Sequence, residues 1–66
     1  MKRKIGGYIF IHKIGDHNGT HIHVYDGDTE LGVYDRQTAQ PTRGLERHWN
    51  RTMREAIEEI ENELGD

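Results

Sequence analysis

Four of the five histidines of this chain lie within its first 23 residues, and three of them belong to one short segment. In that segment His21 and His23 are two residues apart, and His17 precedes His21 by four residues. If a β-strand holds His21 and His23, both imidazoles project from the same face. An imidazole can take up a proton, give one up or bind a metal. We therefore take His17, His21 and His23 as the candidate catalytic residues.

Two kinds of chemistry fit three converging imidazoles. Cleavage of RNA through its 2′-hydroxyl needs one group that removes a proton and another that supplies one, and two imidazoles can share these roles without a cofactor. Zinc binding is the second possibility, because three protein ligands and a water molecule form a common catalytic zinc site. The candidate metal ligands are His17, His21, His23 and Glu30, with Asp16 as a further carboxylate.

An RNA substrate also needs cations beside its phosphates and aromatic rings beside its bases. The candidate substrate-binding residues are two tyrosines and three arginines: Tyr25, Tyr34, Arg36, Arg43 and Arg47. Two interpretations without chemistry stay open. The histidines can be solvent-facing side chains of a sheet covered on one face only. Alternatively, the chain is a non-catalytic binding module or inhibitor that sequesters a protein or nucleic-acid partner, with its acidic C-terminal segment imitating phosphates.

The length of 66 residues predicts one domain, residues 1–66, with a small core. The chain has no cysteine, so disulfides and thiolate metal sites are excluded as stabilising features. Homodimer formation is therefore a reasonable expectation. No apolar segment approaches the roughly 20 residues that span a bilayer. Because the N-terminal segment also does not resemble a signal peptide, we expect a cytoplasmic protein without membrane contact. The net charge of −3 does not favour a general nucleic-acid binder.

Alternating apolar residues predict three strands, over residues 8–14, 20–25 and 29–35. Two hairpin signals, Asn18-Gly19 and Asp26-Gly27, separate them. Two-residue turns at these positions pair Ile14 with His23, His12 with Tyr25, Ile22 with Leu31 and His23 with Glu30. One face would then be apolar: Ile9, Ile11, Ile22, Val24, Leu31 and Val33. The other face would gather His12, His21, His23, Tyr25, Glu30 and Tyr34.

The C-terminal segment predicts a helix over residues 52–64, because apolar residues recur there at helical spacing. These residues are Met53, Ala56, Ile57, Ile60 and Leu64. Thr52 and Glu55 have the spacing of a capping box. Arg51–Glu55 and Arg54–Glu58 are candidate ion pairs one turn apart. With residues 36–51 as a connection, the predicted fold is α+β: a three-stranded antiparallel β-meander whose apolar face packs on the C-terminal helix.

The segments Ile9-Phe10-Ile11, Asp16-His17-Asn18 and His21-Ile22-His23-Val24, followed by Asp26-Gly27 and the C-terminal helix, resemble domain-of-unknown-function family 4160. Its members are small bacterial proteins with an Asp-His-Asn-Pro-Pro-His-x-His core. The resemblance covers residues 5–64, and its specific part is the spacing of the aspartate and the three histidines. This chain has Gly19-Thr20 in place of the two prolines. Members are often encoded in pairs proposed to be toxin–antitoxin systems. The resemblance therefore implies a candidate toxin whose partner is a cognate antitoxin-like protein.

Overall fold

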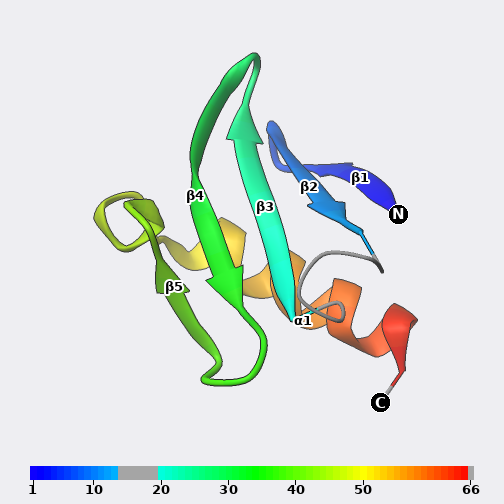
Figure 1. The fold of residues 1–66 in the computed structure, drawn as a ribbon. Coiled ribbons are helices and arrows are strands. Elements are labelled where there is room, and N and C mark those ends of the chain that lie inside the picture. The colour runs from blue at the N-terminus through cyan, green and yellow to red at the C-terminus, as the bar shows by residue number, and fades with distance from the viewer. Residues whose placement is uncertain (14–19, 66) are drawn as a thin grey trace.

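The computed structural model describes residues 1–13 and 20–65, which form an antiparallel sheet and a C-terminal helix (Figure 1). The strands are β1 (Lys2–Ile5), β2 (Tyr8–His12), β3 (His21–Asp26), β4 (Thr29–Asp35) and β5 (Gln40–Thr42). The helices are the 3-10 helix η2 (Leu45–Arg47) and α1 (Arg51–Leu64). The strand order β1-β2-β3-β4-β5 is a meander. The predicted α+β class, with an antiparallel sheet and a C-terminal helix, is confirmed.

The predicted number of strands is wrong, because the sheet has five strands and not three. The basic N-terminal segment forms β1, which pairs with β2 through a two-residue Gly6-Gly7 turn. The predicted connection, residues 36–51, contains β5 and η2. Strand β5 is short and includes Pro41, a residue that sheets tolerate at an edge because it lacks a backbone N–H. Neither described helix has the length and apolar character of a membrane span.

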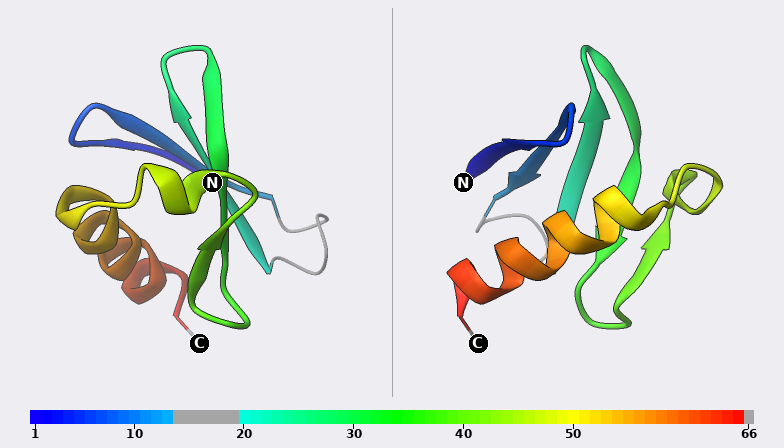
Figure 2. Two further views of the ribbon diagram at one scale, coloured as in Figure 1. Left: turned by 90° about the vertical axis from the view of Figure 1, so that its left-hand side faces the viewer. Right: turned by 180° about the vertical axis from the view of Figure 1, so that it is seen from behind.

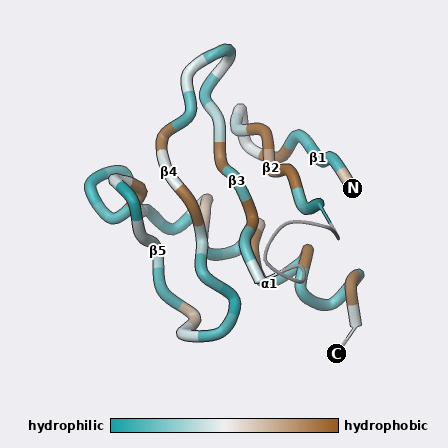
Figure 3. Tube along the Cα trace, viewed as in Figure 1, coloured by the Kyte–Doolittle hydropathy of each residue, from teal (hydrophilic) through white to brown (hydrophobic). Residues whose placement is uncertain are grey.

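Helix α1 covers one face of the sheet, which we call the helix side (Figure 2). Figure 3 shows that hydrophobic residues concentrate on β2, β3, β4 and along α1, whereas β5 is mostly hydrophilic. The buried core between the two layers consists of Phe10, Ile22, Val24, Tyr34, Leu45, Met53, Ala56, Ile57 and Ile60. The predicted packing of Met53, Ile57 and Ile60 against the sheet is confirmed, with Leu64 at the margin of the core.

Helix α1 begins one residue earlier than predicted, and its cap is Asn50 rather than Thr52. The Asn50 side-chain oxygen accepts a hydrogen bond of 2.9 Å from the backbone N–H of Met53. This bond satisfies one of the amide donors that a helix N-terminus leaves without an intrahelical partner. The glycine after the helix, Gly65, closes its C-terminus with a backbone bond to Glu61.

The pairing of β2 with β3 differs from the predicted register. His12 lies opposite Ile22, and Ile11 lies opposite His23. The predicted pairs His12–Tyr25 and Ile14–His23 are therefore wrong. Ile14 and the predicted Asn18-Gly19 turn lie outside the described residues. Because the shift is an odd number of residues, it exchanges the two faces of β2. Phe10 and His12 lie on the helix side, and Ile9 and Ile11 lie on the opposite face, which we call the outer face.

The β3–β4 hairpin also departs from the predicted register. Its turn is Gly27-Asp28, because Asp26 pairs with Thr29. Further along, His23 pairs with Val33, so the predicted His23–Glu30 pair is wrong. Ile22 pairs with Tyr34, so the predicted Ile22–Leu31 pair is also wrong. The register shifts between Val24 and Tyr25, which leaves one extra residue on β4. Consequently Val33 is buried on the outer face and not in the helix-side core.

Candidate active site

The outer face of the sheet carries two of the three candidate catalytic histidines. His21 and His23 lie two residues apart on β3, so their side chains share this face, as the alternation predicted. Tyr25 continues the same row. His17 and Asp16 lie outside the described residues, so the predicted convergence of three imidazoles stays a prediction. Within residues 1–13 and 20–65, no three histidine or acidic side chains gather as the ligands of a metal ion would.

His23 forms a close pair with Glu30. Its Nδ1 lies 2.7 Å from Oε2 of that carboxylate, and the His23 side chain is 21% exposed. An ionised carboxylate only accepts hydrogen bonds, so Nδ1 carries the proton and donates it. In the neutral ring Nε2 is then the acceptor, the nitrogen that can take up a proton. A carboxylate that orients an imidazole in this way is a recurring arrangement in acid–base catalysis.

The β-bulge brings Glu30 to the outer face. Without the extra residue on β4, strict alternation from Val33 would place Glu30 on the helix side. Gly32 makes the bulge possible, because its φ of +153° lies in a region that other residues rarely adopt. A Cβ at Gly32 would also clash with the backbone nitrogen of Leu45, so η2 packs directly against this glycine. The glycine therefore positions the carboxylate that contacts His23.

A shallow cavity of about 210 Å³ surrounds this pair. Its lining residues are His23, Glu30, Gly32, Val33 and Arg43. Arg43 follows β5 and has a φ of +57°, a left-handed conformation that is uncommon outside glycine. Arg43 is thus a cationic residue in the lining of the cavity that contains the imidazole. Among the described carboxylates, none forms an ion pair with Arg43.

His21 is more enclosed than His23, with 9% of its surface exposed. It lies opposite Asp35 at the end of β3, next to the segment outside the described residues. Successive residues on one face of a strand are about 7 Å apart. The two imidazoles therefore flank one stretch of the outer face.

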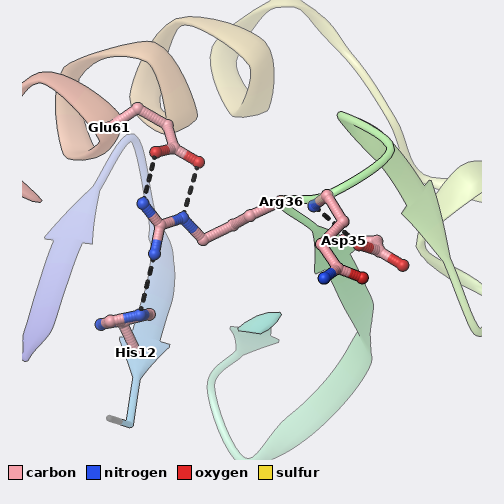
Figure 4. A network of polar contacts seen from close by, with 5 residues as sticks. His12, Asp35, Arg36 and Glu61 are labelled. Carbon is pink, nitrogen blue, oxygen red and sulfur yellow. Dashed lines mark hydrogen bonds and ion pairs between the residues drawn. The ribbon is translucent and has the colours of Figure 1, made fainter. Parts of the chain in front are cut away.

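His12 is not part of the histidine-bearing face, contrary to the prediction. It is 6% exposed on the helix side, at one end of a network in which Arg36 lies between His12 and Glu61 (Figure 4). Arg36 forms two parallel bonds of 2.9 Å to the Glu61 carboxylate, through Nε and Nη2. Its third nitrogen, Nη1, lies 3.2 Å from Nε2 of His12. Because a guanidinium only donates hydrogen bonds, His12 accepts through Nε2. The network joins β2, the end of β4 and α1.

Arg36 is therefore engaged in the fold and not in the outer-face cavity. The hydrogen bond to Glu61 raises the pKa of its guanidinium further above the ordinary value, with a smaller contribution from the charge of that carboxylate. Tyr34 also lies on the helix side, stacked on Trp49 with ring centroids 5.7 Å apart. Burial raises the pKa of the Tyr34 hydroxyl. Its predicted place beside the histidines is wrong. Arg47 is an exposed residue of η2.

The glutamates of α1 are paired with arginines, whereas the outer face of the sheet carries lysines and an arginine. The glutamates of α1 form ion pairs with arginines: Glu55 with Arg51, Glu58 with Arg54, Glu59 and Glu63 with Arg3, and Glu61 with Arg36. The two predicted pairs within the helix are confirmed. On the outer face, β1 contributes Lys2 and Lys4, which lie opposite Ile11 and Ile9. Together with Arg43, these lysines give the histidine-bearing face its cations.

Comparison of the chain with models of known protein families, with curated proteins and with solved structures gave no match. The function is therefore argued from the geometry of the outer face.

Proposed function

We propose that this protein cleaves single-stranded RNA on the outer face of its sheet, with His23 as the general base. The observation that supports this proposal is the 2.7 Å contact between His23 and Glu30, in a cavity that Arg43 also lines. The cavity thus combines a base, a carboxylate that orients it and a cation for a phosphate. Transfer of a phosphoryl group to the 2′-hydroxyl uses these groups together with a proton donor.

In the proposed reaction, Nε2 of His23 takes the proton of the 2′-hydroxyl. The 2′-oxygen forms a bond to phosphorus as the bond from phosphorus to the 5′-oxygen breaks. His21, starting as an imidazolium, gives its proton to the departing 5′-oxygen. The products are a 2′,3′-cyclic phosphate and a 5′-hydroxyl end, so atoms and protons balance without a co-reactant. Arg43 stabilises the charge that develops on the phosphoryl oxygens.

His17 remains a candidate third member of this site, from the sequence alone. The resemblance to domain-of-unknown-function family 4160 supports a biological setting for the activity: a toxin component that a cognate antitoxin-like protein holds inactive. The ion-paired glutamates of α1 are less suited to imitate phosphates, because each already has an arginine partner. This arrangement favours an enzyme over the alternative of a non-catalytic binding module.

The test is cleavage of a labelled single-stranded RNA by the purified chain, with the ends of the products identified. We expect cyclic phosphate products and a bell-shaped dependence of the rate on pH, because one imidazole must start neutral and the other protonated. The rate should survive a chelator. A rate that falls to zero in EDTA and returns with zinc would instead support a metal mechanism.

The matched variants are His21→Ala and His23→Ala, tested singly and together. Both side chains lie outside the helix-side core, although His21 is enclosed, and circular dichroism measures the folded fraction of each variant. Growth arrest that persists on expression of the double variant would contradict catalysis and favour the binding module. Unchanged RNA cleavage by the double variant would contradict the proposal directly.

A further inference from the structure

A second cavity lies on the outer face, next to the His23 cavity. It has a volume of about 250 Å³, and its lining residues are Lys2, Ile9, Ile11, Tyr25, Gly27 and Asp28. Tyr25 is the next residue after His23 on this face of β3, about 7 Å along the strand. The two cavities therefore adjoin through neighbouring side chains of one strand. A chain of nucleotides that places a phosphate at His23 would bring an adjacent base to Tyr25.

The floor of the second cavity is suited to a flat ring. Tyr25 lies opposite Ile9 across the β2–β3 pair, and Ile11 continues the apolar surface on β2. Tyr25 is partly exposed, so a ligand can reach it. Unstacked bases of single-stranded RNA bind on aromatic side chains of this kind.

The rim supplies two polar groups of opposite kind. Lys2 comes from β1, and Asp28 comes from the turn between β3 and β4. The ammonium group of Lys2 donates hydrogen bonds, and the carboxylate of Asp28 accepts them through two oxygens. A ligand that satisfies both must present acceptors on one side and donors on the other.

We propose that this second cavity is a nucleobase subsite with a preference for guanine. The inference rests on the proposed function in placing RNA on the outer face. The Watson–Crick edge of guanine carries two adjacent N–H donors, which match the two oxygens of one carboxylate. Its O6 and N7 are the acceptors that lysine recognises on guanine. Uracil presents only one N–H donor on that edge, and adenine and cytosine present a single amino group.

A third cavity, of about 390 Å³, is less suited to this role although two aromatic residues line it. It lies on the helix side and is lined by residues such as Tyr34 and Trp49, which already stack on each other. A base bound there would be separated from His23 by the sheet. Tyr25 is therefore the aromatic residue that the fold places beside the proposed reaction.

The test is equilibrium binding of 2′-O-methyl oligonucleotides, which have no 2′-hydroxyl and cannot be cleaved. Four labelled pentamers of uridine with G, A, C or U at the centre are titrated with the full chain, and fluorescence anisotropy gives each Kd. We expect the G pentamer to bind most tightly. Tyr25→Ala should weaken its binding roughly 5- to 150-fold, the range for loss of one stacked base, whereas Tyr25→Phe should retain it.

Asp28→Asn should remove the preference for G over the other bases while binding persists, because the neutral amide cannot accept both guanine donors. Asp26→Asn, a change of the same kind at the end of β3, is the matched control and should keep the preference. Equal affinity for all four pentamers, or wild-type binding by Tyr25→Ala, would overturn the subsite. Cleavage of RNA without base preference would contradict the subsite alone. Guanine binding through Tyr25 without any cleavage would contradict the proposed reaction alone.

Discussion

Each face of the sheet holds one histidine, one arginine and one glutamate close together, but the contacts among the three side chains differ. On the helix side Glu61 binds Arg36 through two bonds, and Arg36 donates to His12. On the outer face Glu30 binds His23 directly, and Arg43 stands at the cavity wall. The same side-chain types therefore form a link between elements in one place and a candidate acid–base site in the other.

The difference lies in which nitrogen the neighbours occupy. In His12 the guanidinium occupies Nε2, the acceptor of the neutral ring, so the imidazole cannot take up a proton without breaking that bond. In His23 the neighbour is a carboxylate, and it contacts Nδ1. Histidines of one chain can therefore differ in the group beside the ring, an acceptor for His23 and a donor for His12, and this difference makes His23 the better candidate for a base.

Replacing each histidine separately is the strongest test of this comparison. His23→Ala should lower the rate of RNA cleavage about 10²–10⁴-fold, the usual contribution of a positioned acid or base. His12→Ala should leave the rate per folded molecule within a few-fold of wild type, although it lowers stability. Rates are measured with the folded fraction determined by circular dichroism in the same buffer. Equal losses of rate in both variants would mean that the two regions do not differ in function.

Ile57→Ala tests the core that supports both regions. Ile57 is 3% exposed, between the helix and the sheet. Its truncation should lower the free energy of unfolding by about 2–5 kcal/mol, through lost apolar contacts and the cavity left behind. In a domain of this size that loss is a large part of the total stability. Urea unfolding followed by circular dichroism gives the value. Unfolding at the wild-type urea concentration would mean that α1 does not pack as described.

Gly32→Ala should affect the outer-face site more than the helix-side network. An added Cβ at Gly32 meets the backbone of Leu45, and the φ of Gly32 is one that glycine adopts more readily than other residues. The backbone of the bulge therefore has to move to accept alanine. We expect a loss of about 1–3 kcal/mol in the free energy of unfolding. Because the bulge positions Glu30, cleavage by the folded fraction should also fall. Gly27→Ala is the control, because it also replaces a glycine of positive φ but its added Cβ meets no atom within 4 Å. This variant should retain the His23–Glu30 pair.

Sequence reasoning predicted the fold class, the row of His21 and His23, and the helix face that packs on the sheet. It failed on register for two reasons. The assumed two-residue turns at Asn18-Gly19 and Asp26-Gly27 do not match the observed strand pairs, and the bulge beside Gly32 interrupts the alternation that such reasoning extrapolates. Gly32, between two apolar residues of a strand, is a signal that could have indicated the bulge. Gly6-Gly7, between Ile5 and Tyr8, likewise has the form of a hairpin turn and could have revealed β1.

The helix-side network could not be predicted, because it depends on contacts between residues far apart in the chain. Arg36 and Glu61 are 25 positions apart, and His12 is 24 positions from Arg36. Before the fold is known, Arg36 is one of several arginines available to a phosphate. Its partner becomes evident only when α1 lies against the end of β4.

Arg36→Met should lower the free energy of unfolding by about 1–2 kcal/mol without changing the rate of cleavage by the folded protein. The bonds to Glu61 are charge-assisted, but both side chains are partly exposed, and solvent screening reduces their contribution. Arg51→Met is the control, because its ion pair with Glu55 is at the surface and should contribute less than about 0.5 kcal/mol. Equal effects of the two changes in urea unfolding would contradict the structural role of Arg36.

The smallest expected effect concerns Tyr34, which belongs to the same side of the sheet. Burial raises the pKa of its hydroxyl, so the folded state keeps this proton at a pH where the unfolded chain loses it. Above about pH 10 the unfolded state therefore binds fewer protons, and stability falls as the pH rises. Tyr34→Phe removes that contribution, so its free energy of unfolding should decline less steeply than that of wild type between about pH 9.5 and 11. Urea titrations at several pH values measure the slopes. Identical slopes for Tyr34→Phe and wild type would mean that the hydroxyl is as accessible to water in the folded protein as in the unfolded chain. That result would contradict the buried position of Tyr34 on the helix side, away from the outer-face site.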